Sequence, residues 1–174
     1  MNIKFKPVEE INEYFDYHIE YLKTDILPYD DSPEANFEED LQYFGGDDYR
    51  NWVRENFTSE NNNYKLYIYY IYRDQERIGA FKYVIYKEGE YAGECMLMDF
   101  WLFPPYRSKG AGEEVFNLLV EKAKSEGATH FVINSNSPKS RSFWARMGFV
   151  DNGVDEQGGK LMRKKFYNLG GNKL

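Results

Sequence analysis

One stretch in the middle of the chain constrains the fold more than any other. An apolar run at residues 95–103 (CMLMDFWLF) leads into the glycine-rich, basic sequence PPYRSKGAG, and residues 110–125 then carry apolar side chains at helical spacing. Gly127 stands where a helix C-cap is expected, and residues 130–135 (HFVINS) have the composition of a buried strand. A strand, a helix and a second strand in this order predict a parallel pair with a right-handed crossover.

The rest of the chain supplies strands and helices around this unit. Strands are expected at residues 2–7, 65–73, 77–87, 94–103, at Phe149 and at 161–166, and helices at 8–22, within 37–57 in two pieces split at Gly45-Gly46, and at 137–147. The two strands within 65–87 are joined by a short turn, which predicts an antiparallel hairpin. This order of elements predicts an α/β fold built on a mixed sheet.

Composition narrows the class of protein. The 174 residues suggest one domain, 1–174, and the 42% hydrophobic content predicts a folded chain with a real core. The single cysteine, Cys95, excludes an internal disulfide and a cysteine-built metal site, and it indicates a reducing, cytoplasmic setting. No apolar run approaches about 18 residues, so we expect no membrane span or membrane partner, and the N-terminus does not resemble a signal peptide.

The negative charge of the chain is concentrated in one segment. Residues 25–63 contain eleven acidic side chains against two basic ones, a net charge of −9 within a chain total of −7. A duplex nucleic acid is not an expected partner, because binding it requires a basic face. Two interpretations stay open for the segment: a solvated acidic surface, or a rim that attracts a cationic substrate.

Three phosphate-binding motifs compete for the sequence RSKGAG at residues 107–112. The P-loop pattern fails because Lys109 precedes the glycines and no Ser or Thr follows them. The dinucleotide pattern fails because an apolar residue replaces its third glycine and no acidic residue ends the next strand. The pattern R-x-x-G-x-G matches at Arg107, Gly110 and Gly112.

The matching pattern has a physical basis. Glycines let the backbone fold tightly with its N–H groups pointing inward, and the unpaired amides and dipole of the following helix favour an anion. Arg107 and Lys109 add positive charge. The turn therefore suits a pyrophosphate, and the alternative is a helix start with incidental basic residues.

A second motif indicates which pyrophosphate is expected. Residues 137–149 read SPKSRSFWARMGF, and residues 102–112 read LFPPYRSKGAG. The first stretch resembles the short-helix pattern N-x-x-A-x-x-F-Y-x-x-x-G-F of the GNAT superfamily, and the second resembles the strand end and phosphate turn of the same superfamily. Two motifs in the right order and separation are far more specific than either alone. The chain thus resembles the GNAT superfamily of acetyl-CoA-dependent N-acetyltransferases, closely over residues 94–149 and by element order elsewhere.

The resemblance carries expectations about fold and activity. It implies a GNAT fold of the α+β type, with a mixed, mostly antiparallel sheet of six to seven strands and helices on both faces. It implies transfer of an acetyl group from acetyl-CoA to a primary amine by direct attack in a ternary complex, with no metal. Residues 94–149 would form the CoA-binding core and the acidic residues 25–63 the acceptor-side wall, which favours a cationic small molecule or peptide as acceptor. A homodimer is an open expectation, by family analogy only.

Family roles carry over to matching positions. The pyrophosphate would be held by the side chain of Arg107 and by the backbone amides of Ser108, Lys109, Gly110, Ala111 and Gly112. Trp101 and Leu102 would pair their backbone with pantetheine as a neighbouring strand does, and one of their amides would polarise the thioester carbonyl.

The second motif departs from the family pattern at two positions. Ser137 falls where the family often has an Asn that touches the cofactor, and Asn134 and Asn136 are close enough to substitute. Trp144 replaces the tyrosine that commonly protonates the leaving thiolate, and an indole cannot supply that proton. Two alternatives stay open: another tyrosine protonates the thiolate, or the thiolate leaves without a proton donor. Trp144 itself is expected to pack against pantetheine or in the core.

The residues expected to act as general base depart from the family pattern as well. The family positions that often carry it fall at Met96 or Met98, both apolar. Strict alternation places these residues on one face with Glu94, and places Asp99 on the other face with Cys95. Asp99, the one charge inside the apolar run, and Glu94, acting through water, are the catalytic candidates. The alternatives are a hydrogen-bonded structural Asp99 and a solvent-exposed strand end at Glu94.

Two classes of function follow from these observations. The first is an enzyme, an N-acetyltransferase acting on a primary amine. The second is a GNAT-fold module that binds acyl-CoA without turnover, as a sensor or partner subunit, which the two methionines and the missing tyrosine would explain. An amine panel assayed with acetyl-CoA distinguishes the two.

Overall fold

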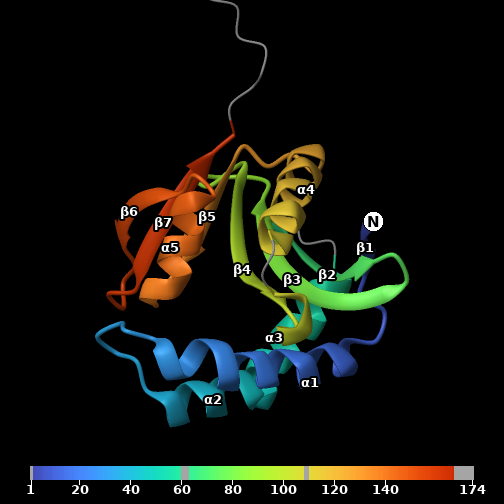
Figure 1. Ribbon diagram of the computed structural model, residues 1–174. Coiled ribbons are helices and arrows are strands. Elements are labelled where there is room, and N and C mark those ends of the chain that lie inside the picture. Colours follow the sequence, from blue (N-terminus) through green and yellow to red (C-terminus); the bar gives the residue numbers. More distant parts are fainter. Residues whose placement is uncertain (1, 60–62, 108–109, 167–174) are drawn as a thin grey trace, which may run out of the picture.

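The computed structural model describes residues 2–59, 63–107 and 110–166. Its centre is a seven-stranded sheet in which every neighbouring pair is antiparallel except β4 and β5, which are parallel (Figure 1). In sheet order the strands are β1 (Ile3–Pro7), β2 (Tyr64–Arg73), β3 (Glu76–Tyr86), β4 (Glu94–Leu102), β5 (His130–Asn134), β7 (Lys160–Lys165) and β6 (Val150–Val154). The predicted mixed, mostly antiparallel sheet is confirmed, and the strand expected at Phe149 begins one residue later and runs over Val150–Val154.

The helices lie on both faces of this sheet, as predicted (Figure 1). They are α1 (Ile11–Tyr21), α2 (Phe37–Gly45), α3 (Asp47–Thr58), α4 (Ala111–Ser125) and α5 (Pro138–Arg146). After α1 the chain continues through a π-helical turn, η1 (Leu22–Ile26), and a 3-10 turn, η2 (Leu27–Tyr29), with Pro28 near its start. None of the helices described is long and apolar enough to span a membrane.

A β-bulge at Met98 divides β4 into two halves that face opposite ways. Asp99 pairs with Lys82 of β3, Leu97 pairs with the next residue, and Met98 is left out of the register. Before the bulge, Cys95 and Leu97 pack into the apolar cluster under α4 and α5; after it, Asp99 lies beside Lys82 on the opposite face. The strict alternation expected for this strand is therefore wrong, because one extra residue exchanges the two faces.

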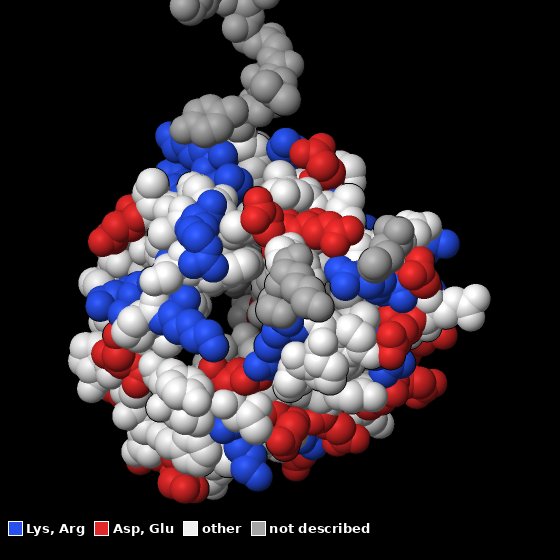
Figure 2. Space-filling model, in the orientation of Figure 1, with Lys and Arg blue, Asp and Glu red and all other residues white. Residues whose placement is uncertain are grey.

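The sheet opens between β4 and β5. The parallel pairing joins Glu94–Met96 to His130–Val132, and no further residues of the two strands are paired in the described part of the chain. Beyond Met96, β4 follows β3 while β5 follows β7, so the two strands diverge. The space-filling view shows a hollow here, between α5 and the end of β4, with basic side chains beside it and acidic ones below (Figure 2). The second half of β4 therefore has an edge without a strand partner in the described part of the chain.

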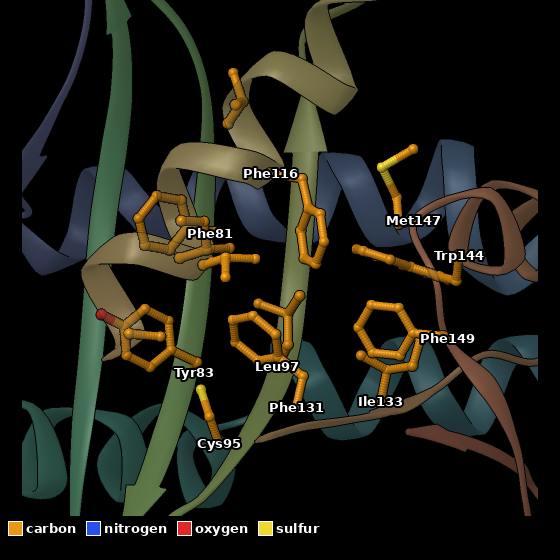
Figure 3. Packing of buried hydrophobic residues seen from close by; sticks show 14 of the residues in the cluster. Phe81, Tyr83, Cys95, Leu97, Phe116, Phe131, Ile133, Trp144, Met147 and Phe149 are labelled. Atoms are coloured by element: carbon orange, nitrogen blue, oxygen red, sulfur yellow. The ribbon is translucent and has the colours of Figure 1, made fainter. Parts of the chain in front are cut away.

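Two hydrophobic clusters hold the helices to the sheet. The cluster under α4 and α5 contains interlocking aromatic and aliphatic side chains, among them Phe81, Phe116 and Phe131, all essentially inaccessible to solvent (Figure 3). The cluster under α1 and α3 contains Tyr14 and Val53, but the same face also buries charged side chains. Among the described residues, the cluster under α4 and α5 is thus the one without buried charged side chains.

Candidate active site

The predicted phosphate turn lies at the end of β4 and opens α4. Gly110 is the N-cap of α4 with a φ of +80°, a left-handed conformation that glycine adopts without strain, and no side chain of the described residues caps the helix. A Cβ at Gly112 would lie 3.2 Å from the Phe143 ring of α5, so this glycine permits close packing of the two helices. The first-turn amides of α4 have no partner within the helix, which suits an anion. Ser108 and Lys109 lie outside the described residues.

Arg107 is fully engaged in this structure. Its Nε donates to the carbonyl oxygen of Leu102 at 2.7 Å. Its two terminal nitrogens contact the carboxylate oxygens of Asp25, in η1, at 2.9 and 2.5 Å. The contact of Arg107 with a pyrophosphate stays a prediction, and here the guanidinium holds the acidic segment against the end of β4.

The backbone of β4 near the turn exposes one of the two predicted pantetheine partners. A Cβ at Gly79 would lie 2.2 Å from the carbonyl oxygen of Trp101, so that oxygen faces β3. The carbonyl of Leu102 faces the opposite, open edge, where it meets Arg107. The Trp101 ring is buried and stacks on Tyr21 with ring centroids 4.6 Å apart. Leu102 is therefore the better placed of the pair to bind an extended ligand through its backbone.

The polar residues of the second motif have structural partners. Ser137 is the N-cap of α5, where its Oγ accepts from the backbone N–H of Ser140 at 3.2 Å. The side chain of Asn134 donates to Asp155, and Asn136 Oδ1 accepts from the backbone N–H of Lys160 at 2.9 Å. Cofactor contacts by these residues stay predictions.

Trp144 lies in the apolar cluster. Its indole packs edge-on against Phe100, Phe116 and Phe149, with ring centroids 5.6, 5.5 and 5.2 Å away, and it is almost wholly buried (Figure 3). Of the two placements expected for it, the core is the one observed.

Asp99 belongs to a buried charge cluster beneath α1 and α3. Lys82 Nζ lies 2.6 Å from Asp99 Oδ2 and also donates to the Tyr49 hydroxyl, and His18 Nε2 lies 3.3 Å from Asp99 Oδ1. The side chains of Lys82 and Asp99 are 1% and 8% exposed. A lysine this deeply buried requires a partner, and the carboxylate supplies it.

The protonation states in this cluster follow from burial and charge. Burial alone would raise the pKa of Asp99, but the positive charge of Lys82 and the contact with His18 outweigh it and hold that pKa well below its usual range. Burial likewise opposes the charge on Lys82, yet Asp99 and Tyr49 raise the Lys82 pKa. Burial lowers the pKa of His18. Because a carboxylate with so low a pKa is a weak proton acceptor, Asp99 is better suited to hold charge in place than to act as a general base.

Glu94 lies at the closed end of the opening, where β4 and β5 still pair. Its Oε2 is 3.3 Å from His130 Nε2, and His130 Nδ1 is 2.9 Å from Thr129 Oγ1. The Glu94 side chain is 19% exposed, so water can reach it. Its catalytic role through water stays a prediction.

Three side chains at this site were not among the site residues predicted from the sequence. Lys82 carried a usable signal, since it is a lone charge within the apolar run of β3, as Asp99 is in β4. His18 and Asp25 carried none, because their partners come from β4 and the turn, far along the chain. Of the described His, Cys, Asp and Glu side chains, no three lie close enough together to hold a metal ion.

Comparison with known proteins agrees with this geometry. The profile of the Acetyltransferase (GNAT) family matches residues 27–149. No curated protein matches the chain at the sequence level. The chain therefore belongs to the GNAT acetyltransferase family, on the strength of a match that spans well over half of its length.

Solved structures show the same fold at low sequence identity. The PaiA N-acetyltransferase of Thermoplasma acidophilum, crystallised with coenzyme A, is 17% identical with a TM-score of 0.64, and the alignment covers 95% of this chain and 100% of that one. YycN of Bacillus subtilis is 19% identical with a TM-score of 0.68, covering 88% and 96%. A ribosomal-protein-alanine N-acetyltransferase of Brucella melitensis is 13% identical with a TM-score of 0.59, covering 95% and 100%.

Proposed function

We propose that this chain transfers an acetyl group from acetyl-CoA to the primary amine of a cationic small molecule or peptide, by direct attack in a ternary complex. Membership of the family supports acyl transfer from CoA in general. The kind of acceptor and the direct attack in a ternary complex are what we propose. The observation that carries it is the start of α4, which no described side chain caps and where Gly110 has a left-handed conformation, next to the open edge of β4. An anion and an extended chain can bind there side by side.

The donor side uses backbone groups more than side chains. The amides of residues 108–112 would hold the pyrophosphate, joined by Arg107 once it leaves Asp25. The open edge at Leu102 would pair with pantetheine, as an added strand does. A backbone amide on this edge would stabilise the negative charge that develops on the thioester oxygen as the amine attacks.

Proton transfer is the demanding part of the reaction. An alkyl ammonium has a pKa near ~10, so presenting the neutral amine at pH 7 costs on the order of 4 kcal/mol unless a base takes the proton. Of the two candidate carboxylates, Glu94 has water access and Asp99 is held as an anion by Lys82. We propose that Glu94 accepts the proton through water, and that Asp99 shapes the electrostatics of the acceptor side. The thiolate leaves without a proton from Trp144.

The acidic side of the molecule favours a cationic acceptor. A shallow hollow between α2 and α3 is lined by Glu39, Gln42, Tyr43, Gly46, Asp47 and Asp48. The carboxylates of Glu39, Asp47 and Asp48 make this hollow negative, while Asp25 and Asp31 at the opening are each balanced by an arginine in the free protein. Such a field attracts ammonium groups and repels acidic substrates.

A panel of amines tests the proposed function. Acetyl-CoA consumption, with product masses, should show acetylation of cationic primary amines and little of neutral or acidic ones. Reaction with neutral or acidic amines alone would refute the charge argument. Calorimetric binding of coenzyme A with no transfer to any amine would refute the enzyme and favour the alternative, a non-catalytic CoA-binding module.

A matched pair of glycine variants tests the location of the donor. Gly110 and Gly89 both have a left-handed φ, +80° and +78°, and a Cβ at either would meet nothing within 4 Å. Alanine at each position should cost about 1 kcal/mol of stability through the same backbone strain. Only Gly110→Ala should also weaken coenzyme A binding, because only Gly110 shapes the turn. Equal binding by both variants would place the donor elsewhere.

A further inference from the structure

The acidic strap, residues 25–31, crosses the opening between β4 and β5. At one end Asp25 contacts Arg107, which follows the end of β4. At the other end Asp31 contacts Arg141 of α5, and the backbone N–H of Asp31 donates to the carbonyl of Asn136 at 2.7 Å. The strap therefore ties the two sides of the opening together.

The two ion pairs of the strap are alike in geometry. In each, the two terminal nitrogens of the arginine meet the two carboxylate oxygens, at 2.9 and 2.5 Å. Each arginine also donates to a backbone carbonyl, Arg107 to Leu102 at 2.7 Å and Arg141 to Ser135 at 3.0 Å.

The surroundings of the two pairs differ. Arg141 is anchored beside the loop that leads into α5, where the strap is also tied by backbone. Arg107 instead lies on the open edge of β4 and directly precedes the phosphate turn. Its guanidinium covers the Leu102 carbonyl, which an extended ligand on that edge would need. Arg107 is thus positioned where a donor would meet it.

We propose that Arg107 exchanges partners during the reaction, from Asp25 in the free protein to the donor's pyrophosphate in the complex, and that Asp25 is thereby released to bind the ammonium group of the acceptor. This inference rests on the proposed function and adds an acceptor-binding residue to it.

The exchange is physically reasonable at this position. The side chains of Arg107 and Asp25 are 41% and 27% exposed, so water screens their attraction and the pair is easily broken. A pyrophosphate offers more acceptor oxygens and more negative charge to a guanidinium than one carboxylate does. The Asp31–Arg141 ion pair keeps the strap in place when the Asp25–Arg107 ion pair breaks.

Asp25→Asn tests the exchange, and Asp31→Asn is its matched control. Asp25→Asn removes the charge that competes for Arg107, so coenzyme A affinity measured by calorimetry should rise, by up to about fivefold for an exposed pair. The same variant should raise the KM for a cationic amine. Asp31→Asn should leave coenzyme A affinity unchanged, because Arg141 does not adjoin the turn.

The outcomes separate this inference from the proposed function. If the wild-type chain binds no coenzyme A, the proposed function fails and the exchange with it. If the wild type binds coenzyme A and Asp25→Asn binds it equally or more weakly, the exchange alone is refuted. A KM for the cationic amine that Asp25→Asn leaves unchanged would likewise refute the acceptor role of Asp25. Asp25→Glu, which restores the charge, should return the affinity toward the wild-type value.

Discussion

The two faces of the sheet bury different chemistry. Under α4 and α5, the cluster around Phe116 and Phe131 contains no buried charged side chain among the described residues. Under α1 and α3, a comparable cluster surrounds Lys82, Asp99 and His18, all at most 8% exposed. The first face supports the helix whose start forms the phosphate turn, so rigid packing suffices there. The second face underlies the acidic side, where we propose that the buried charges shape the electrostatics of the acceptor site. Loss of one partner of such a buried pair lowers the stability of the fold.

One strand serves both faces because of its bulge. If the strand kept regular alternation through Met98, Asp99 would lie under α4 with Leu97, in a cluster that contains no buried charged side chain among the described residues. With the bulge, Asp99 lies beside Lys82. The bulge also marks the part of β4 that diverges from β5, so the same local feature accompanies both the opening and the charge pair.

The largest expected effect comes from removing one partner of the buried charge pair. Lys82→Met leaves Asp99 buried without compensation, and we expect a loss of about 3–5 kcal/mol in the free energy of unfolding. The double variant Lys82→Met/Asp99→Asn removes both charges and should recover a substantial part of this loss. Urea denaturation of the two single variants and the double variant gives the coupling energy. A double variant whose losses are simply additive would contradict a direct pair.

Acid should weaken the charged face in two stages. The His18 pKa is lowered from 6.5 on folding, so the unfolded chain binds a proton more readily and stability begins to fall as the pH drops below 6.5. The Asp99 pKa is lowered from 3.8, so its contribution is complete above about that pH and is lost as the pH falls further. Unfolding measured from pH 8 to pH 3 should show both stages. His18→Phe should abolish the first, and a first stage that survives in this variant would assign it to another group.

The apolar face should respond more weakly and without pH dependence. Phe116→Leu removes part of a ring that packs against Phe131 and Trp144, and we expect a loss of about 1–2 kcal/mol. The loss should be the same at pH 8 and pH 5, because none of the described residues buried in this cluster carries a charge. A loss that changes between these two pH values would show that the two faces are not independent.

Local features of the fold were predictable from sequence, and long-range ones were not. The glycine turn, the hairpin of β2 and β3 and the motif on α5 each lie within a short stretch, so spacing and residue type suffice to place them. The bulge at Met98 is set by pairing with β3, which a pattern of alternating residues does not reveal. The Arg107–Asp25 pair joins residues 82 positions apart, and composition predicted only that the segment was acidic.

A crystal structure of the chain with coenzyme A tests the central claim most directly. The account predicts the pyrophosphate against the backbone amides of Gly110 to Gly112, pantetheine along the β4 edge at Leu102, and Arg107 turned from Asp25 toward the phosphates. A pyrophosphate bound away from the start of α4 would contradict the central claim.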